Sequence, residues 1–170
     1  MPDGQPNQHL YFSSMTSPIG RLSILADAQG VVEIRFPNHV SGQGRSLPER
    51  TRQTNDIVER AIDQLQAYFD GRLKAFDLPL SLHGTDFQKR VWQQLCRINF
   101  GDTASYGDIA KKIGKPKAAR AVGMANNKNR IPIVIPCHRI IGSDGSLTGF
   151  AGGLDTKRWL LSHEQSCAGL

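Results

Sequence analysis

Residues 105–127 read SYGDIAKKIGKPKAARAVGMANN, and this stretch predicts two short helices joined by a sharp break. Ser105 is a typical helix N-cap, and apolar residues follow it at helical spacing. Gly114-Lys115-Pro116 breaks that helix. A second helix then buries only small side chains, with i, i+3, i+4, i+7 spacing at Ala118, Ala121, Val122 and Ala125. Such a pair is typical of a helix-turn-helix, although many helix pairs without DNA-binding function share the pattern.

The region around these helices is strongly basic. From His83 to Arg130 there are ten Lys or Arg and three acidic residues, which accounts for the net charge of +6 and the pI of about 9.5. A concentrated basic region favours a polyanion, because each neutralised phosphate releases counterions. A solvated surface without a partner is the alternative. The face of the second helix opposite its small residues offers Lys117, Arg120, Met124 and Asn127.

The flanking segments complete a C-terminal domain that we expect at 83–170. Upstream, Thr85 to Gln88 form a capping box, and the helix that it begins is predicted to end at Gly101. Downstream, the apolar run 131–136, which is bounded by prolines, predicts a buried extended segment. A glycine-rich loop follows, and then a final helix that Asp155 caps.

The N-terminal part predicts a small α+β supporting domain at 15–82, preceded by a flexible N-terminus at 1–14. Alternating residues on both sides of Asp27-Ala28-Gln29-Gly30 predict a hairpin, and residues 37–54 predict a loop. Asn55 then caps an amphipathic helix that ends at Gly71, and a short strand follows at 78–82. The fold class is therefore α+β: a small antiparallel sheet with a helix, then a mostly helical domain with a winged-helix-like helix-turn-helix.

Composition excludes several classes of protein. The chain of 170 residues is 39% hydrophobic, enough for a real core, but it has no run of about 18 apolar residues that would span a membrane. It lacks a secretory signal, so we expect a soluble intracellular protein. Cys96, Cys137 and Cys167 are odd in number and form no C-x-x-C pair, which disfavours both a disulfide framework and a structural zinc site.

Pro136-Cys137-His138-Arg139 carries the clearest chemistry. A thiol attacks carbon well only as thiolate, so a neighbour must accept its proton, and His138 is the nearest candidate. Adjacent residues in a strand point to opposite faces, so direct or water-mediated contact requires a turn here. A bare Cys-His pair is more often structural, with a buried cysteine beside a hydrogen-bonded histidine.

A series of segments in fixed order and spacing outweighs the structural interpretation of the Cys-His pair. Arg120–Asn129, Ile135–Arg139, Gly149–Gly153 and Trp159–Glu164, within a region that starts at Thr85, resemble the signature of the O(6)-alkylguanine-DNA alkyltransferases, also called methylated-DNA–protein-cysteine methyltransferases. The resemblance is strong from Thr85 to Glu164 and covers only the general layout of 15–82. It implies direct-reversal repair, in which an alkyl group moves irreversibly and stoichiometrically from O(6) of guanine, and from O(4) of thymine, to a protein cysteine.

The resemblance also implies roles for individual residues. Cys137 is the expected alkyl acceptor, His138 the base acting through a water, and Glu164 the group that orients His138. Asn129 is expected to hold the turn, and Tyr106 to protonate the departing guanine. Arg120 is expected to fill the gap that the flipped base leaves. The further DNA contacts would be Tyr106, Gly107, Lys115, Lys117, Asn127 and Ser143, and the pocket for the base would be lined by Pro132, Ile140, Phe150 and Ala151.

The resemblance implies no cofactor and no metal, double-stranded DNA with alkylated guanine as the partner, a monomer, and a cytoplasmic, nucleoid-associated location if the source is prokaryotic. Two residues depart from the family pattern: Arg130 replaces a proline, and Phe150 replaces a tyrosine whose hydroxyl would bind the base. Three alternatives remain: a sensor of alkylated DNA, which would lack the acceptor cysteine, a transcription regulator, and a cysteine hydrolase.

Overall fold

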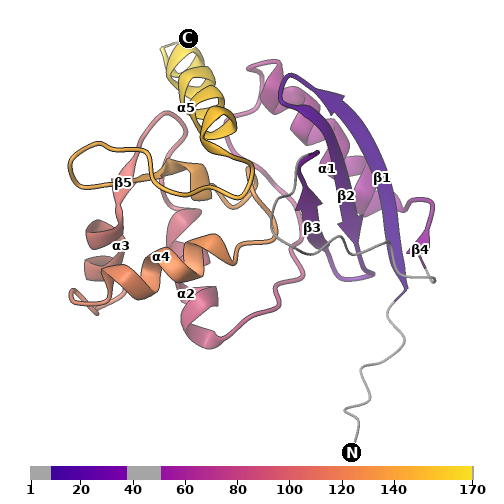
Figure 1. Ribbon diagram of the computed structural model, residues 1–170. Coiled ribbons are helices and arrows are strands. Elements are labelled where there is room, and N and C mark those ends of the chain that lie inside the picture. The colour runs from indigo at the N-terminus through magenta and orange to yellow at the C-terminus, as the bar shows by residue number, and fades with distance from the viewer. Residues whose placement is uncertain (1–8, 38–50, 170) are drawn as a thin grey trace, which may run out of the picture.

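The computed structural model of the protein describes residues 9–37 and 51–169. Its N-terminal part is a four-stranded sheet in the order β3-β2-β1-β4, with helix α1 (Asp56–Phe69) packed on one face (Figure 1). Strands β1 (Leu10–Ser17), β2 (Gly20–Ala26) and β3 (Val31–Arg35) are antiparallel, whereas β4 (Thr51–Arg52) pairs parallel with β1. The α+β class and the small sheet predicted from the sequence are confirmed.

Local sequence explains most of this unit. The predicted hairpin forms between β2 and β3, where the Asp27 side chain accepts hydrogen bonds from Gln29 N at 2.7 Å and Gly30 N at 3.0 Å. Asn55 caps α1 by accepting from Val58 N at 2.9 Å, and Gly71 follows the helix with φ +77°. Both predictions are confirmed because the turn and the cap depend on neighbouring residues.

The predicted flexible segment 1–14 is wrong from Leu10 onward. Residues 10–14 belong to β1, which lies between β2 and β4, and only residues 1–8 fall outside the described part. Leu10, Tyr11 and Phe12 are consecutive, so the strand begins without an apolar–polar alternation, and pairing with β2 in the register Tyr11 to Ala26 defines it. The predicted loop 37–54 also contains β4, while 38–50 lies outside the described residues.

The C-terminal part is mostly helical and lies to the left of the sheet in Figure 1, with α5 (Leu154–Ala168) at the top. Helix α2 (Asp86–Leu95) begins with the predicted capping box, in which Gln88 N donates to Thr85 Oγ1 at 3.1 Å. It ends at Leu95 and not at Gly101, because the chain folds into turns after Cys96 and returns Ile98 to the core.

Helices α3 (Tyr106–Lys112) and α4 (Ala119–Asn127) form the predicted helix-turn-helix, with Gly114 in the connecting turn at φ +78°. The two helices pack on each other and α2 packs on α4, where Trp92 Nε1 donates to Ala125 O at 2.9 Å. Val122 and Ala125 are buried as expected, but Ala121 is exposed, so the buried stripe is narrower than its spacing indicated. Two short parallel strands, β5 (Ala104–Ser105) and β6 (Ile140–Ile141), lie beside α3.

Residues 131–136 are buried, as predicted, but they are not extended. The run contains a tight turn in which Pro132 pairs with Ile135 and Ile133 has φ +73°. A β-branched residue rarely adopts this conformation, so the surrounding contacts must hold it. No helix within residues 9–37 and 51–169 combines the length and the apolar character that a bilayer crossing requires.

Candidate active site

The turn at 131–136 continues directly into a 3-10 helix, η1 (Cys137–Arg139), which supplies the bend that contact between Cys137 and His138 requires. Asn129 holds this turn from both ends. Its Nδ2 donates to Ile135 O at 2.9 Å, and its Oδ1 accepts from Ile131 N at 2.9 Å. Asn129, which was expected to position the turn, therefore forms hydrogen bonds with the backbone on both sides of Ile133, the residue with positive φ.

His138 and Glu164 form a buried pair. His138 Nε2 lies 2.6 Å from Glu164 Oε1, and the two side chains are 0% and 1% exposed. An ionised carboxylate only accepts, so Nε2 carries the proton and Nδ1 is left with a lone pair. Nδ1 has no hydrogen-bond partner among the described residues. Burial lowers the pKa of His138, against the opposing effect of Glu164, and the imidazole is therefore neutral at neutral pH.

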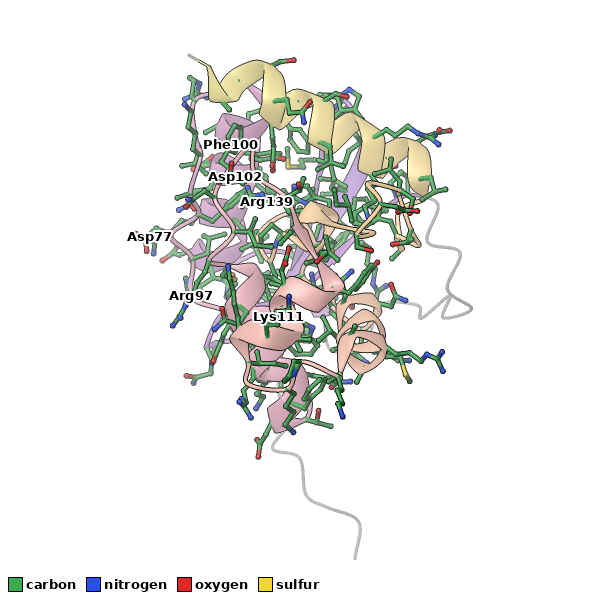
Figure 2. All side chains as sticks on the ribbon, turned by 90° about the vertical axis from the view of Figure 1, so that its left-hand side faces the viewer. Asp77, Arg97, Phe100, Asp102, Lys111 and Arg139 are labelled. Atoms are coloured by element: carbon green, nitrogen blue, oxygen red, sulfur yellow. The ribbon has the colours of Figure 1, made fainter. Side chains whose placement is uncertain are left out.

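Glu164 accepts hydrogen bonds from several elements of the fold. Besides His138, it accepts from Tyr68 Oη at 2.8 Å, from Arg139 Nε at 2.9 Å and from the backbone N of Gly101 at 3.3 Å. Arg139 lies under α5 beside Phe100 (Figure 2), and it also donates to Ile98 O at 2.6 Å. Burial alone would raise the pKa of Glu164, but the hydrogen bonds from His138 and Arg139 outweigh it and hold the pKa at about 2.

Cys137 is almost enclosed, with 5% of its surface exposed. Burial raises the pKa of its thiol to about 11, although a hydrogen bond from Asn129 and the charge of Lys157 oppose the rise. A buried thiol of this kind is inert unless a base takes its proton at the moment of reaction. The neutral His138, with its unpartnered Nδ1, has the protonation state that such a base needs.

A second group of side chains approaches the site from α3 and α5. Tyr106 Oη lies 2.5 Å from Thr148 Oγ1, and Lys157 Nζ donates to Thr148 O at 3.0 Å. Thr148 therefore joins the expected proton donor, at the start of α3, to a buried lysine in the first turn of α5.

The residues expected to contact DNA lie on the helix-turn-helix and the loop after β6. Arg120, Lys115, Lys117, Asn127 and Ser143 are exposed, and Tyr106 and Gly107 are partly exposed. Figure 1 shows α3 and α4 on the side of the molecule remote from the sheet. The guanidinium of Arg120 makes no hydrogen bond or ion pair within the described part of the chain. Met124, one turn after Arg120, is 66% exposed.

The four residues expected to line the pocket for the base differ in how deeply they are buried. Pro132 is buried in the turn, and Ile140 is 0% exposed in β6. Phe150 is partly buried and packs against Phe36 with ring centroids 5.5 Å apart, while Ala151 is exposed. A separate cavity of about 180 Å³ lies behind η1, where Pro136, Arg139 and Phe76 line it and Cys137 does not.

Comparisons with known proteins decide the family. The model of the 6-O-methylguanine DNA methyltransferase DNA binding domain matches residues 86–166, and that of the 6-O-methylguanine DNA methyltransferase ribonuclease-like domain matches residues 10–82. The chain belongs to the 6-O-methylguanine DNA methyltransferase family. Methylated-DNA–protein-cysteine methyltransferases of Methanosarcina acetivorans and Mycobacterium tuberculosis are each 46% identical to it, over 93% and 94% of this chain and 100% and 94% of theirs.

Solved structures of this family share the whole fold. Mycobacterium tuberculosis OGT in complex with DNA has a TM-score of 0.83 at 43% identity, covering 92% of this chain and 94% of that one. The O6-methylguanine-DNA methyltransferase of Pyrococcus kodakaraensis has a TM-score of 0.65 at 28% identity, covering 91% and 98%. Within residues 9–37 and 51–169, no three His, Cys, Asp or Glu side chains are grouped to hold a metal ion.

Sequence reasoning missed three members of this family site. Tyr68 lies on the buried face of the amphipathic helix α1, where its spacing indicates a core position, but a buried phenol needs a hydrogen-bond partner. Arg139 follows the Cys-His pair and was given no role. Lys157 could have been found by spacing, since Lys157, Leu160 and Glu164 are the three buried residues of α5 at i, i+3 and i+7.

Proposed function

We infer that this protein repairs alkylated DNA directly, by moving a methyl or larger alkyl group from O(6) of guanine to the sulfur of Cys137. The observation that carries the proposal is the protonation pattern of His138, whose Nε2 is held by Glu164 while Nδ1 lacks a partner in the described residues. A buried imidazole whose Nε2 is hydrogen-bonded to a carboxylate can act as a general base through Nδ1. Family membership supports the same reaction.

The proposed reaction begins with the thiol proton. A bridging water passes it from Cys137 to Nδ1 of His138, and Glu164 stabilises the imidazolium that forms. The thiolate then attacks the alkyl carbon in line with the C–O bond, which breaks as the C–S bond forms. The electron pair leaves with guanine. The product thioether has no ready route to hydrolysis, so each protein molecule acts once.

Two other residues protonate the leaving group and fill the gap in the duplex. Tyr106 donates a proton to the departing guanine, for which the incoming base must replace Thr148 as its hydrogen-bond partner. Solvent then returns a proton to the Tyr106 phenolate, and His138 releases to solvent the proton that it took from the thiol. A lesion at O(6) lies inside the base stack, so the nucleotide has to be rotated out. Arg120 is exposed and unpaired within the described chain, and a long permanent cation suits filling the resulting gap.

Two features of this chain define the proposed DNA contact. Lys115, Lys117, Asn127 and Ser143 are exposed and Gly107 is partly exposed, and all five are proposed to contact the DNA backbone. Phe150 supplies packing against Phe36 but no hydroxyl for the base, and the loss of one such hydrogen bond costs about 1 kcal/mol. We further propose that the protein acts as a monomer in the cytoplasm, associated with DNA, and also accepts O(4)-alkylated thymine.

Mass spectrometry after incubation with a methylated duplex tests the proposal. Trypsin releases residues 131–139 as a peptide in which Cys137 is the only cysteine, so transfer adds one methyl group to that peptide. The amount of repaired guanine should equal the amount of modified peptide. Cys96→Ser is the matched control and should react normally.

The alternatives predict different results. A sensor of alkylated DNA would bind the duplex and leave the peptide unmodified. A cysteine hydrolase would process many substrate molecules per protein, and a transcription regulator would keep its activity after Cys137→Ser. Any of these outcomes contradicts alkyl transfer to Cys137.

A further inference from the structure

Two buried side-chain atoms of the described residues have no hydrogen-bond partner there. One is His138 Nδ1, the proposed proton acceptor, and the other is Asn126 Oδ1. Asn126 is 3% exposed and lies in the last turn of α4. A buried amide is almost always hydrogen-bonded, because an unpaired one loses the free energy of its bond with water. A buried amide oxygen that lacks a protein partner therefore indicates a bound water or a ligand group.

The position of Asn126 on α4 directs its side chain towards the reacting groups. Gly123, three residues earlier, faces Tyr106, because a Cβ at Gly123 would lie 3.5 Å from Cε1 of the ring. Side chains of a helix lean back over the preceding turn, so the amide of Asn126 is directed towards Gly123 and this ring. The backbone oxygen of Asn126 accepts from Asn129 N at 3.3 Å, and the side chain of Asn129 forms a hydrogen bond with the Cys137 thiol. Asn126 is thus placed between Tyr106 and Cys137.

The bridging water of the proposed reaction has to be oriented as well as bound. It must donate one O–H to His138 Nδ1 and keep a lone pair directed at the thiol proton of Cys137. Its second O–H needs another acceptor, because an O–H directed at the sulfur would occupy the path of the thiol proton. Asn126 Oδ1 is the buried side-chain oxygen that lacks a partner in residues 9–37 and 51–169. A buried water typically makes about three hydrogen bonds, and these three groups supply them.

We propose that Asn126 is a positioning residue for alkyl transfer, whose Oδ1 accepts one hydrogen of the water that links the Cys137 thiol to His138 Nδ1. The inference rests on the proposed function, since it orients the water of that relay. The water gives one proton to Nδ1 as it takes the thiol proton, so it is a neutral water before and after the step. Its new O–H points at the thiolate, and no covalent bond of Asn126 changes.

Asn126→Leu tests the proposal, because leucine has nearly the same shape and no acceptor. The single-turnover rate of transfer should fall about tenfold, the effect of one hydrogen bond in a relay whose base contributes about 10²–10⁴. The loss should be equal for methyl and benzyl groups, because it acts on the thiol proton and not on the alkyl group. The Tm should change by less than about 4 °C, since one hydrogen bond contributes about 1 kcal/mol.

The matched control is the same substitution at an exposed asparagine. Asn99→Leu lies on the turn after α2 and should keep the natural rate. A double-mutant cycle then separates the relay from packing. His138→Gln keeps a donor to Glu164 but supplies no base, so adding Asn126→Leu to it should cause less than a twofold further loss. A role of Asn126 in packing or in contact with guanine would persist in this background as the full tenfold loss.

Crystallography of the natural protein gives an independent measurement that does not depend on how any variant folds. One water should lie within about 3.2 Å of both Asn126 Oδ1 and His138 Nδ1, in contact with the sulfur of Cys137. In Asn126→Leu this water should be lost or displaced, while the bond between His138 and Glu164 is kept.

Several results would overturn the proposal. An Asn126→Leu rate within threefold of the natural one would show that the relay does not depend on the amide. The same tenfold loss in the His138→Gln background, or losses that differ more than threefold between methyl and benzyl groups, would assign Asn126 to packing or to the base pocket. A crystal structure in which no water joins Asn126 to His138 would also contradict it. Failure of the natural protein to methylate the 131–139 peptide would instead contradict the proposed function itself, so the two failures are distinguishable.

Discussion

Glu164→Gln tests whether the buried cluster under α5 serves stability, chemistry or both. The substitution keeps the shape of the side chain and removes its charge. Arg139, whose side chain is 7% exposed, then has no buried counter-ion, and His138 loses an anionic acceptor. Breaking a buried ion pair by removing one partner costs about 3–5 kcal/mol. In a protein of this size each kcal/mol lowers Tm by about 2–4 °C, so we expect a loss of roughly 6–20 °C.

The rate of alkyl transfer should fall further than stability explains. Without the carboxylate, the imidazolium that forms at His138 lacks its stabilising charge, and general-base catalysis contributes about 10²–10⁴ in rate. The assay combines thermal unfolding with the appearance of the methylated 131–139 peptide over time. Asp155→Asn is the control, since Asp155 is fully exposed and pairs only at the surface with Arg158. It should change neither Tm nor rate.

A double variant separates the two effects. Adding Arg139→Met to Glu164→Gln removes the uncompensated cation, so Tm should recover by several degrees. The rate should not recover, because His138 still lacks its anionic acceptor. A Tm for Glu164→Gln within about 2 °C of the natural protein would refute the stability argument, given the sensitivity above. Recovery of the rate together with Tm would refute the chemical one.

Three further predictions concern DNA, acid and the product. Arg120→Ala should slow repair of a methylated duplex by about tenfold or more and leave the reaction with a free modified base unchanged; equal losses in the two rates would remove its assigned role. The free energy of unfolding should fall as pH drops. Buried, neutral His138 contributes this loss below about pH 6.5. Glu164, with a folded pKa near 2 against 4.5, contributes about 3 kcal/mol that is lost between those values; urea unfolding at pH 7, 5 and 3 measures both, and a flat profile contradicts them. Alkylation of Cys137 should lower Tm, since added bulk at a site 5% exposed costs about 1–3 kcal/mol; an unchanged Tm in calorimetry of the product would reject this.

Elements with local signals could be predicted from the sequence. The Thr85 capping box, the Asn55 cap and the Asp27 turn were all found, because each depends on residues within four positions of one another. Residues 10–14 of β1 were predicted to be flexible, because this strand is stabilised by pairing with β2 and β4 rather than by an apolar alternation of its own.

The turn before Cys137 is a feature of the site that the local preference of its sequence does not predict. An apolar run between prolines favours an extended strand, but Asn129 bonds both sides of the segment and Ile133 adopts a positive φ. Side-chain hydrogen bonds from Asn129, to residues two and six positions along the chain, over-rule the preference of the run for an extended strand. The family resemblance identified Cys137, His138 and Glu164, whereas Tyr68, which donates to Glu164, lies on α1 and outside the motif segments.

The hydroxyl of Tyr68 joins the two halves of the family pattern. Tyr68 lies on α1, in the region that matches the ribonuclease-like domain, and its partner Glu164 lies in the region that matches the DNA binding domain. A fragment starting at residue 83 would leave Glu164 Oε1 facing solvent where the phenol now covers it. A chimera with the first half of another relative would keep this hydrogen bond only if that half carries a tyrosine at the equivalent position of its helix. The N-terminal region, which carries no reactive group of its own, thus supplies a hydrogen bond that holds Glu164 in place beside His138.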